Sequence, residues 1–523
     1  MDHANEMPIP FPFDIAAKHM PEIPALGGGH GGAMPPTRGV RVLFQLFVLA
    51  CALAVPASAA NKLVVRNAFI ITVQPGATPF AGYLVVGEDG RIAEIGPGDP
   101  PAEVRAAATL DAQGRFVAPG FISAHSHLFQ SPLRGLGHDS TLYGWLAAIN
   151  RINRYSTPED IYWFCLHGSL DYLRNGITTA YDFTYSGGLG GGQHSVGAGE
   201  KSDIPPPDQE PYEKSQIRAK LDSGIRFIDS VSIVPLGTED EIRLRFERVL
   251  AYARQFSGNP RFLKMAISGW VQLAPARDAA EREARFMHAY GLINQAHFLE
   301  SPDRVAEQQA KFAWYRDAGA LGPNFIFAHF VQTNPEIVRE AAASGASMCW
   351  QPTSNGRLGS GVADVVAYRA AGMKIGMGLD DQSCTDISDP FQNLRIGLYA
   401  IRDLYKNAGA LTVRDILGMH TIGSAEILHV EDQVGSLEKG KWADFLVVDP
   451  RSPDTGPVHD PIATYVLACG LRNLKQVYVS GELVADGITL VKQDEPAIRS
   501  QIDTRMARLE NTASRNEAKP LTR

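Results

Sequence analysis

The chain has 523 residues, of which 45% are hydrophobic and 20% are charged, and its formal net charge at pH 7 is −8. It is longer than one small module, and its apolar fraction excludes an intrinsically disordered chain. Because the charge is mildly negative and no run of Lys and Arg occurs, nucleic acid and anionic membranes are not expected as partners. A small molecule is the expected partner.

Residues 1–59 are expected to lie outside the fold. The apolar run from Val42 to Val55 follows Arg38 and Arg41 and precedes a stretch of small residues. This order is typical of a cleaved export signal, and the run is too short to span a bilayer comfortably. We interpret the segment as an upstream extension plus a signal peptide, with Met34 as the expected start. The mature product would be periplasmic or secreted, with no membrane partner after cleavage; an uncleaved anchor is the alternative.

Two β-rich segments lie near opposite ends of the remaining chain. Residues 60–117 contain alternating apolar positions and the hairpin signal Asp89-Gly90, and residues 431–493 contain the strand patterns ADFLVVD and KQVYVSGELVADG. We predict that both segments join in one small β-sandwich domain. A helix-like stretch and a polar tail follow over residues 494–523.

Residues 118–430 alternate helix-like segments with short apolar runs. Ile161–Leu173 precedes ITTAYDF, for example, and Val305–Ala318 precedes NFIFAHF. Such repetition is typical of parallel β/α units and predicts an α/β fold, a (β/α)8 TIM-like barrel, with an open doubly wound sheet as the alternative. The Gly- and Pro-rich stretch 186–211 lacks periodicity and is interpreted as a lid or a disordered insertion.

Polar side chains follow four of the expected barrel strands. His125 and His127 end one apolar run at positions i and i+2, which face the same side of a strand. His297, His329 and Asp380 end three further runs, QAHFLE, FIFAHF and IGMGLDD. The C-terminal strand ends of a β/α barrel open on one face, so these five side chains are expected to meet there. Imidazoles and a carboxylate in one place suit a metal ion.

This ordered set of motifs resembles the amidohydrolase superfamily, in its branch of triazine hydrolases and guanine and cytosine deaminases. The resemblance runs from about Lys62 to Gly487 and rests on APGFISAHSHLFQSPLRGLG, LRNGITTAYDF, HFLE, QPTSNGRLGSG, GMGLDD and GSLEKGKWADFLVVD. It implies hydrolysis of non-peptide C–N bonds in a small cyclic or aromatic substrate by a metal-bound hydroxide. Deamination or dechlorination of a triazine, purine or pyrimidine ring is the alternative, and a catalytically inactive binding barrel is a remote one.

The resemblance also implies roles for individual residues. One divalent metal, with Zn²⁺ as the first candidate and Fe²⁺ as the second, would be held by four ligands: His125, His127, His297 and Asp380. Glu300 would be the proton shuttle, His329 would orient the attacking water or the developing oxyanion, and Asp380 would hold the hydroxide. Relatives with two metals bridge them from the end of the fourth strand, but Lys264 lies near the start of that strand, so one metal is expected.

Four further residues are candidates for substrate contacts. Gln130 follows the first metal motif, and Trp145, Trp270 and Trp350 lie near expected strand ends. Aromatic side chains suit a pocket for a planar ring, and packing in the core is the alternative for the indoles. The cysteines are far apart without any C-x-x-C, which argues against a disulfide scaffold, and a homo-oligomer is left open.

Overall fold

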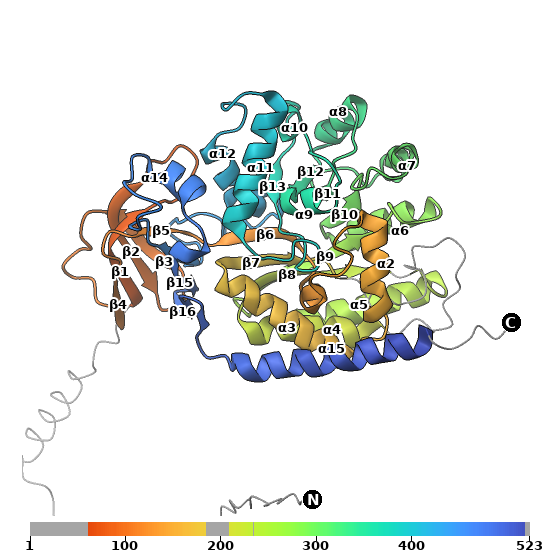
Figure 1. Ribbon diagram of the computed structural model, residues 1–523, viewed down its shortest axis with the longest axis horizontal. Coiled ribbons are helices and arrows are strands. Elements are labelled where there is room, and N and C mark those ends of the chain that lie inside the picture. The colour runs from red at the N-terminus through yellow and green to blue at the C-terminus, as the bar shows by residue number, and fades with distance from the viewer. Residues whose placement is uncertain (1–60, 185–208, 234, 518–523) are drawn as a thin grey trace, which may run out of the picture. The chain divides into compact units, whose positions relative to one another are not determined.

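The computed structural model describes residues 61–184, 209–233 and 235–517 (Figure 1). The interpreted export signal with Met34, most of the stretch 186–211 and the end of the polar tail lie outside these residues. Residues 209–211 of that stretch already belong to a helix, α4. Within the described part of the chain, no helix combines the length and apolarity that crossing a membrane requires.

Eight parallel strands form the barrel in sequence order. They are β6 (Phe121–Ser126), β7 (Ile177–Asp182), β8 (Arg226–Ser232), β9 (Phe262–Gly269), β10 (Asn294–Phe298), β11 (Phe325–His329), β12 (Ser347–Trp350) and β13 (Ile375–Met377). A parallel bridge between Ser126 and Asp380 brings the first and last strands together. The predicted (β/α)8 barrel is therefore confirmed, and the open doubly wound sheet is excluded because its outer strands would not meet.

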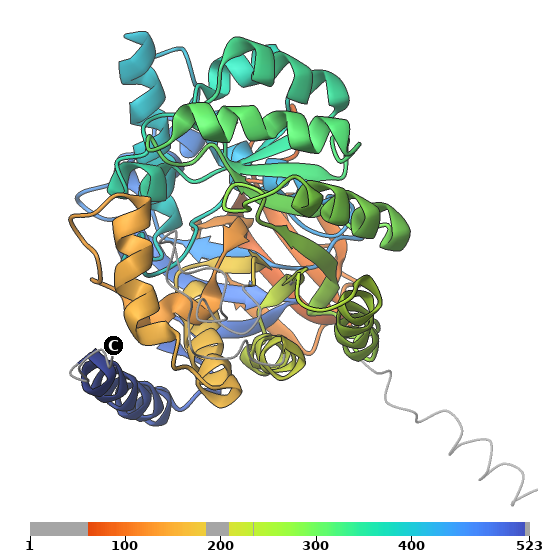
Figure 2. The same cartoon turned by 90° about the vertical axis from the view of Figure 1, so that its right-hand side faces the viewer.

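Helices surround the barrel strands (Figure 2). They are α3 (Pro158–Arg174), α4 (Gln209–Ser223), α5 (Glu239–Arg254), α6 (Asp278–Tyr290), α7 (Val305–Asp317), α8 (Pro335–Ser344), α10 (Val365–Ala370), α11 (Pro390–Tyr405), α12 (Val413–Met419) and α13 (Ile422–Ile427). Capping boxes at Thr157 and Thr238 begin α3 and α5, since each threonine and the third helical residue satisfy one another's backbone N–H groups. Gly345 ends α8 with φ 86°, a conformation that favours glycine.

A buried ion cluster ties α4 to the barrel. Lys220 of α4 forms ion pairs with Asp182 at the end of β7 and Asp229 in β8, and all three side chains are fully buried. The other oxygen of Asp182 accepts a hydrogen bond from the backbone N–H of Leu128 at 3.0 Å. Leu128 begins the short helix η1 (Leu128–Leu133), so the cluster also fixes the turn that follows His127.

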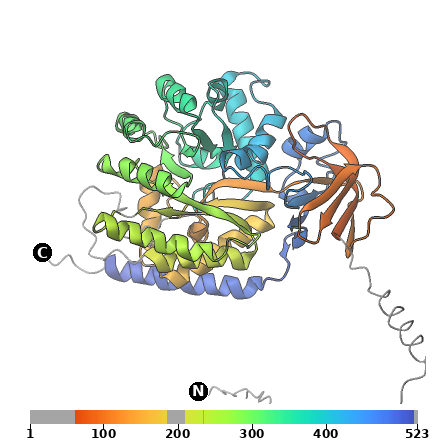
Figure 3. The ribbon, with the colours of Figure 1, turned by 180° about the vertical axis from the view of Figure 1, so that it is seen from behind.

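The two chain ends share a second sheet beside the barrel (Figure 3). Its strands are β1 (Asn61–Ile70), β2 (Phe80–Gly87), β3 (Ile92–Pro97), β4 (Ala108–Asp111), β5 (Phe116–Pro119), β14 (Phe445–Val448), β15 (Leu474–Val479), β16 (Glu482–Asp486) and β17 (Thr489–Leu490). The ends meet where β5 pairs antiparallel with β14, from Phe116 opposite Val448 to Pro119 opposite Phe445. Arg226 of β8 binds Asp444 at 2.7 Å and links this sheet to the barrel.

The remaining helices lie outside this β/α alternation. They are α2 (Leu142–Asn153), α9 (Pro352–Arg357), α14 (Pro461–Ala463), the short helical turns η2 (Thr464–Ala468) and η3 (Leu471–Asn473), and the long C-terminal helix α15 (Glu495–Glu517). Helix α15 runs along α3 and α2 (Figures 1 and 3). It buries Ile498, Ile502 and Leu509, and Arg505 binds the buried Asp160 of α3 at 3.0 Å.

Candidate metal centre

Four side chains converge where strands β6, β10 and β13 end. The Nε2 atom of His297 lies 3.1 Å from that of His125 and 3.2 Å from that of His127. The Oδ1 atom of Asp380 lies 3.3 Å from the Nε2 atoms of both His125 and His127. Ligand atoms bound at 2.0–2.2 Å to a tetrahedral Zn²⁺ lie about 3.3 Å apart, so the separations fit four ligands of one ion.

Hydrogen bonds on the far side of two imidazoles set their orientation. Nδ1 of His125 lies 2.5 Å from Oε1 of Gln295, whose amide nitrogen in turn donates to the carbonyl of Ala124. Nδ1 of His127 lies 2.7 Å from the carbonyl oxygen of Phe183. Each acceptor requires the hydrogen on Nδ1, which leaves the Nε2 lone pair facing the shared point. Burial and the neighbouring imidazoles hold the pKa of His297 well below its usual range, so it is neutral as a ligand must be.

The Asp380 carboxylate is held by both of its oxygens. While Oδ1 faces the imidazoles, Oδ2 accepts a hydrogen bond from Ser354 Oγ at 2.6 Å and lies 3.1 Å from Cys384 Sγ. Burial opposes its ionisation, but the interactions with His125 and His127 outweigh burial and hold the pKa of Asp380 well below the usual range. Its backbone has φ 66°, in the left-handed region, and the bridge to β6 keeps it there.

His329 and Glu300 lie beside this ligand set. His329 Nε2 is 3.7 Å from Glu300 Oε1 and 3.8 Å from Asp380 Oδ2, and it has no hydrogen-bond partner among the described residues. Asn355 donates to His329 Nδ1 at 2.9 Å, which places the imidazole hydrogen on Nε2. Burial lowers the pKa of His329 to about 3, so the ring is neutral and its Nε2–H is available to an oxygen between Glu300 and Asp380.

Glu300 is a buried carboxyl group beside the ligand set. It is 3% exposed, and its backbone N–H donates to Oε1 of Gln272 at 3.3 Å. Burial, together with the charges of Asp380 and Asp381, raises the pKa of Glu300 well above its usual value. A carboxyl group of raised pKa, 3.7 Å from His329 Nε2, and a carboxylate of lowered pKa, 3.8 Å from the same atom, therefore flank one position, which is the arrangement of a proton donor beside a metal ligand.

Comparison with known proteins agrees with this centre. The model of the amidohydrolase family matches residues 116–484. The chain belongs to the amidohydrolase family. As an amidohydrolase, it is a metal-dependent hydrolase that acts on non-peptide C–N bonds.

Individual relatives are more distant. The amidohydrolase is 27% identical over 460 residues to the 5-methylthioadenosine/S-adenosylhomocysteine deaminase of Symbiobacterium thermophilum, which covers 86% of this chain and 99% of the relative. Among solved structures, an adenosine deaminase from Xanthomonas campestris with bound zinc has a TM-score of 0.74 and 21% identity, covering 86% of this chain and 99% of that one. An atrazine chlorohydrolase mutant from Arthrobacter aurescens, complexed with zinc and atraton, has a TM-score of 0.72 and 21% identity, covering 85% and 100%. At these identities the structural likeness bears on the fold.

Three of the four substrate candidates lie in loops or helices near the strand ends of the amidohydrolase. Gln130 is buried, and its side-chain amide lies 2.8 Å from Ser383 Oγ. Trp145 of α2 donates from Nε1 to the carbonyl oxygen of Ser383 at 3.1 Å. Both therefore contact the loop that follows Asp380. Trp270 follows β9, is buried, and its backbone N–H donates to Glu283 Oε1 at 2.9 Å.

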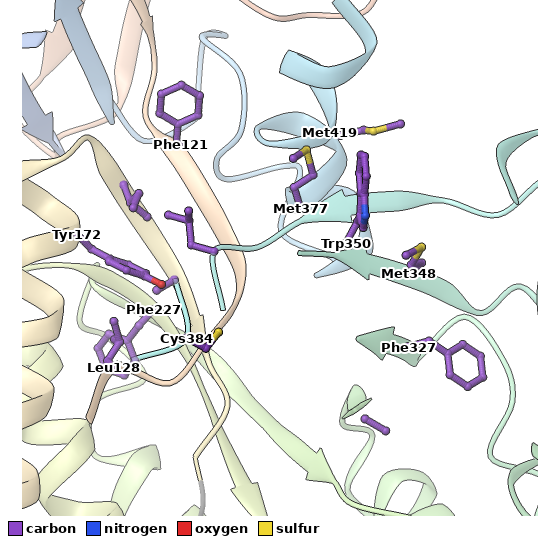
Figure 4. Close-up of a cluster of buried hydrophobic side chains, with 14 of the residues drawn as sticks. Phe121, Leu128, Tyr172, Phe227, Phe327, Met348, Trp350, Met377, Cys384 and Met419 are labelled. Atoms are coloured by element: carbon purple, nitrogen blue, oxygen red, sulfur yellow. The ribbon is translucent and has the colours of Figure 1, made fainter. Parts of the chain in front are cut away.

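Trp350 requires a correction. Its indole packs against helix α11, where a Cβ added to Gly397 would lie 2.9 Å from Cη2 of the ring. It lies in the same hydrophobic layer as Met348 and Met377 (Figure 4), whereas Cys349 belongs to the cluster inside the barrel. Alternate residues of a strand face opposite sides, so Trp350 points outward to the helices and does not line the substrate pocket.

Four residues that hold the centre were not assigned a role from the sequence. They are Gln295, Ser354, Asn355 and Asp381. Ser354 and Asn355 lie in the motif QPTSNGRLGSG and form part of α9. A polar pair in the loop and short helix that follow β12 was the available signal, since such residues lie on the same face as the metal ligands.

Proposed function

We propose that this amidohydrolase deaminates a small amino-substituted heterocycle of the purine, pyrimidine or triazine type. The observation that carries the proposal is the position of the buried Glu300, 3.7 Å from His329 Nε2 and beside the four-ligand set, with its pKa raised by burial. The relatives support it, because those named above include deaminases of adenosine derivatives. Water replaces the amino group in the reaction, so a ring carbon gains oxygen and ammonia leaves.

We further propose that the ion is one Zn²⁺ per chain. Three imidazole nitrogens and one carboxylate oxygen are donors that zinc favours, and four-ligand separations near 3.3 Å suit its tetrahedral geometry. Such an ion supplies a bound water of lowered pKa, which makes a nucleophile available near neutral pH. Metal analysis that returns two equivalents per chain would contradict the proposal.

The residues of the chain divide the proton transfers among them. Glu300 donates its proton to a nitrogen of the substrate as electron density builds up there, and the proton lost by the attacking water restores it. His329 donates from Nε2–H to the oxygen that adds to the ring carbon, while Asn355 fixes that tautomer. Asp380 accepts at Oδ2 from Ser354, which keeps Oδ1 directed at the ligand set.

The test is ammonia release by the purified chain across a panel of amino purines, pyrimidines and triazines, with chloride release from the matching chloro compounds measured alongside. Glu300→Gln should retain the metal while turnover falls by about 10²–10⁴-fold, the usual contribution of general acid–base catalysis. His288→Gln is the matched control, because His288 is exposed on α6 and its Nε2–H donates to the carbonyl oxygen of Gly319 at 2.9 Å, away from the centre. Chloride release without ammonia release would replace deamination with dechlorination.

We also propose export of the chain to the periplasm or the medium. The basic, apolar and small-residue order around residues 38–60 supports this. The N-terminal sequence of the protein purified from its native host is the test. A terminus at residue 60 is expected, and an intact N-terminus would contradict export with cleavage.

A further inference from the structure

A second buried carboxylate borders the metal centre. Asp381 is 1% exposed, and its Oδ1 accepts three hydrogen bonds, from Ser383 N–H at 2.6 Å, Ser383 Oγ at 2.6 Å and Cys384 N–H at 2.8 Å. Its Oδ2 is buried and has no hydrogen-bond partner among the described residues. The loop therefore holds the carboxylate by one oxygen and leaves the other as a free acceptor.

Asp381 lies beside the ligand set. One of its carboxylate oxygens, a ligand nitrogen of His127 and a carboxylate oxygen of Asp380 all lie within 4.8 Å of one another. A buried acceptor without a partner is destabilising, and native structures supply one from a ligand or an ordered water. Because His127 and Asp380 belong to the ligand set, a molecule that binds at the metal centre lies within reach of Asp381 and can supply that partner.

A second metal ion is the alternative partner for the Asp381 carboxylate. The neighbouring residues that would hold such an ion, however, already belong to the first ligand set. His127 Nε2 and Asp380 Oδ1 both belong to the first set, at 3.2 Å from His297 and 3.3 Å from His127 respectively. Lys264, which would be the bridging residue, donates from Nζ to the carbonyl oxygen of His429 at 3.3 Å. Asp381 would be the one unshared protein ligand, too few for a bound ion.

We propose that Asp381 Oδ2 accepts a hydrogen bond from the amino group that leaves the substrate. Resting on the proposed deamination, this contact defines the substrate class more closely. A ring that bears –NH₂ at the attacked carbon offers an N–H to Asp381, whereas a ring that bears chloride at the same carbon offers none and places a second electron-rich atom against a carboxylate. Asp381 thereby selects amino-substituted rings over their chloro analogues.

The test is equilibrium binding of matched pairs of probes to the metal-loaded full chain with Glu300→Gln, which removes turnover. The pairs are adenosine with 6-chloropurine riboside, and melamine with its monochloro analogue, measured by calorimetry. Adding Asp381→Asn keeps the shape of the side chain and its Oδ1 acceptor. We expect binding of the amino member to weaken at least tenfold and that of the chloro member to change less than twofold, with the metal content unchanged.

Two further variants complete the design. Asp386→Asn is the matched control, because Asp386 lies in the same loop with an exposed carboxylate and should leave both members unchanged. Ser383→Ala removes one of the hydrogen bonds that hold Asp381 and should selectively weaken binding of the amino member. This variant keeps the inference testable if Asp381→Asn does not fold.

The remaining outcomes refute either the role of Asp381 or the proposed deamination. Equal weakening of both members, or no change in either, refutes the role of Asp381 and leaves the proposed deamination standing. Loss of a metal equivalent in Asp381→Asn makes Asp381 a metal ligand and also refutes the inference. Failure of the parent Glu300→Gln chain to bind either amino probe argues against the proposed function itself, and the inference falls with it.

Discussion

A residue of the short helix α9 donates a hydrogen bond to the Asp380 carboxylate. Losing this bond should weaken metal binding. Ser354 Oγ donates to Asp380 Oδ2 at 2.6 Å. We predict that Ser354→Ala removes this bond and lets the carboxylate rotate away from the geometry in which Oδ1 lies 3.3 Å from His125 and His127.

The magnitude follows from the contacts of Oδ2. A hydrogen bond to an ionised group contributes about 1.5–3 kcal/mol. Cys384 Sγ, at 3.1 Å from the same oxygen, remains as a weaker donor, so the lower end of that range applies. A loss of about 1.5 kcal/mol corresponds to roughly tenfold weaker metal binding, which agrees with the 10–100-fold effect usual for residues that orient metal ligands.

The assay is competition with a chromophoric chelator at fixed pH, which gives the Kd of the metal directly. Thr353→Val is the matched control, because Thr353 is the preceding residue of α9 and its Oγ1 donates to Asn393 Oδ1 at 2.7 Å rather than to the centre. The reasoning is refuted if Ser354→Ala binds the metal within twofold of the parent chain, or no more weakly than Thr353→Val does.

Three more changes test other parts of the structure. Asn355→Ala frees the His329 tautomer, so kcat should fall about 10–100-fold with the bound metal unchanged; a kcat equal to that of the parent would contradict the assigned role of Asn355. Lys220→Met leaves two carboxylates buried without their cation, so the free energy of unfolding in urea should fall by about 3–5 kcal/mol, and a fall below 1 kcal/mol would show that the cluster is not stabilising. Burial raises the pKa of Glu283 from 4.5 to about 7. The folded chain then retains a proton that the unfolded chain releases, so stability falls as pH rises from 4.5 to 7, by roughly 2–3 kcal/mol between pH 5 and pH 8. Glu283→Gln should remove this part of the pH dependence, and equal slopes in both chains would contradict it.

The convergence of His125, His127, His297 and Asp380 could be predicted from the sequence because strand periodicity and barrel geometry act together. Each apolar run ends in the residue concerned, and the C-terminal ends of parallel strands share one face. His125 and Asp380, far apart in the sequence, therefore meet, and a backbone hydrogen bond from Asp380 N–H to His125 O at 3.1 Å makes the contact direct. No such rule determines which way each imidazole hydrogen points, since that depends on Gln295 and Asn355.

The error at Trp350 has a different cause. Strand β12 has only four residues, all buried, so the sequence shows no alternation of polar and apolar positions from which to read the inward side. Pairing of β12 with β11 and β13 determines which residues face inward, and Cys349 lies inside the barrel. The sequence of a short strand that is buried on both faces therefore does not show which residues face inward. The Trp350 indole, predicted to contact the substrate, instead belongs to the hydrophobic layer between the strand and α11.

The contrast among the three carboxyl groups accounts for their separate uses. The interactions with two imidazoles lower the pKa of Asp380, while burial and the charges of Asp380 and Asp381 raise the pKa of Glu300, which lies 3.7 Å from His329. A single divalent ion cannot balance three ionised carboxylates, so retention of a proton on Glu300 also lowers the electrostatic repulsion within the centre. The carboxylate of Asp381 therefore acts in two ways: it offers an acceptor beside the reacting carbon, and its charge helps to keep on Glu300 the proton that the leaving nitrogen requires.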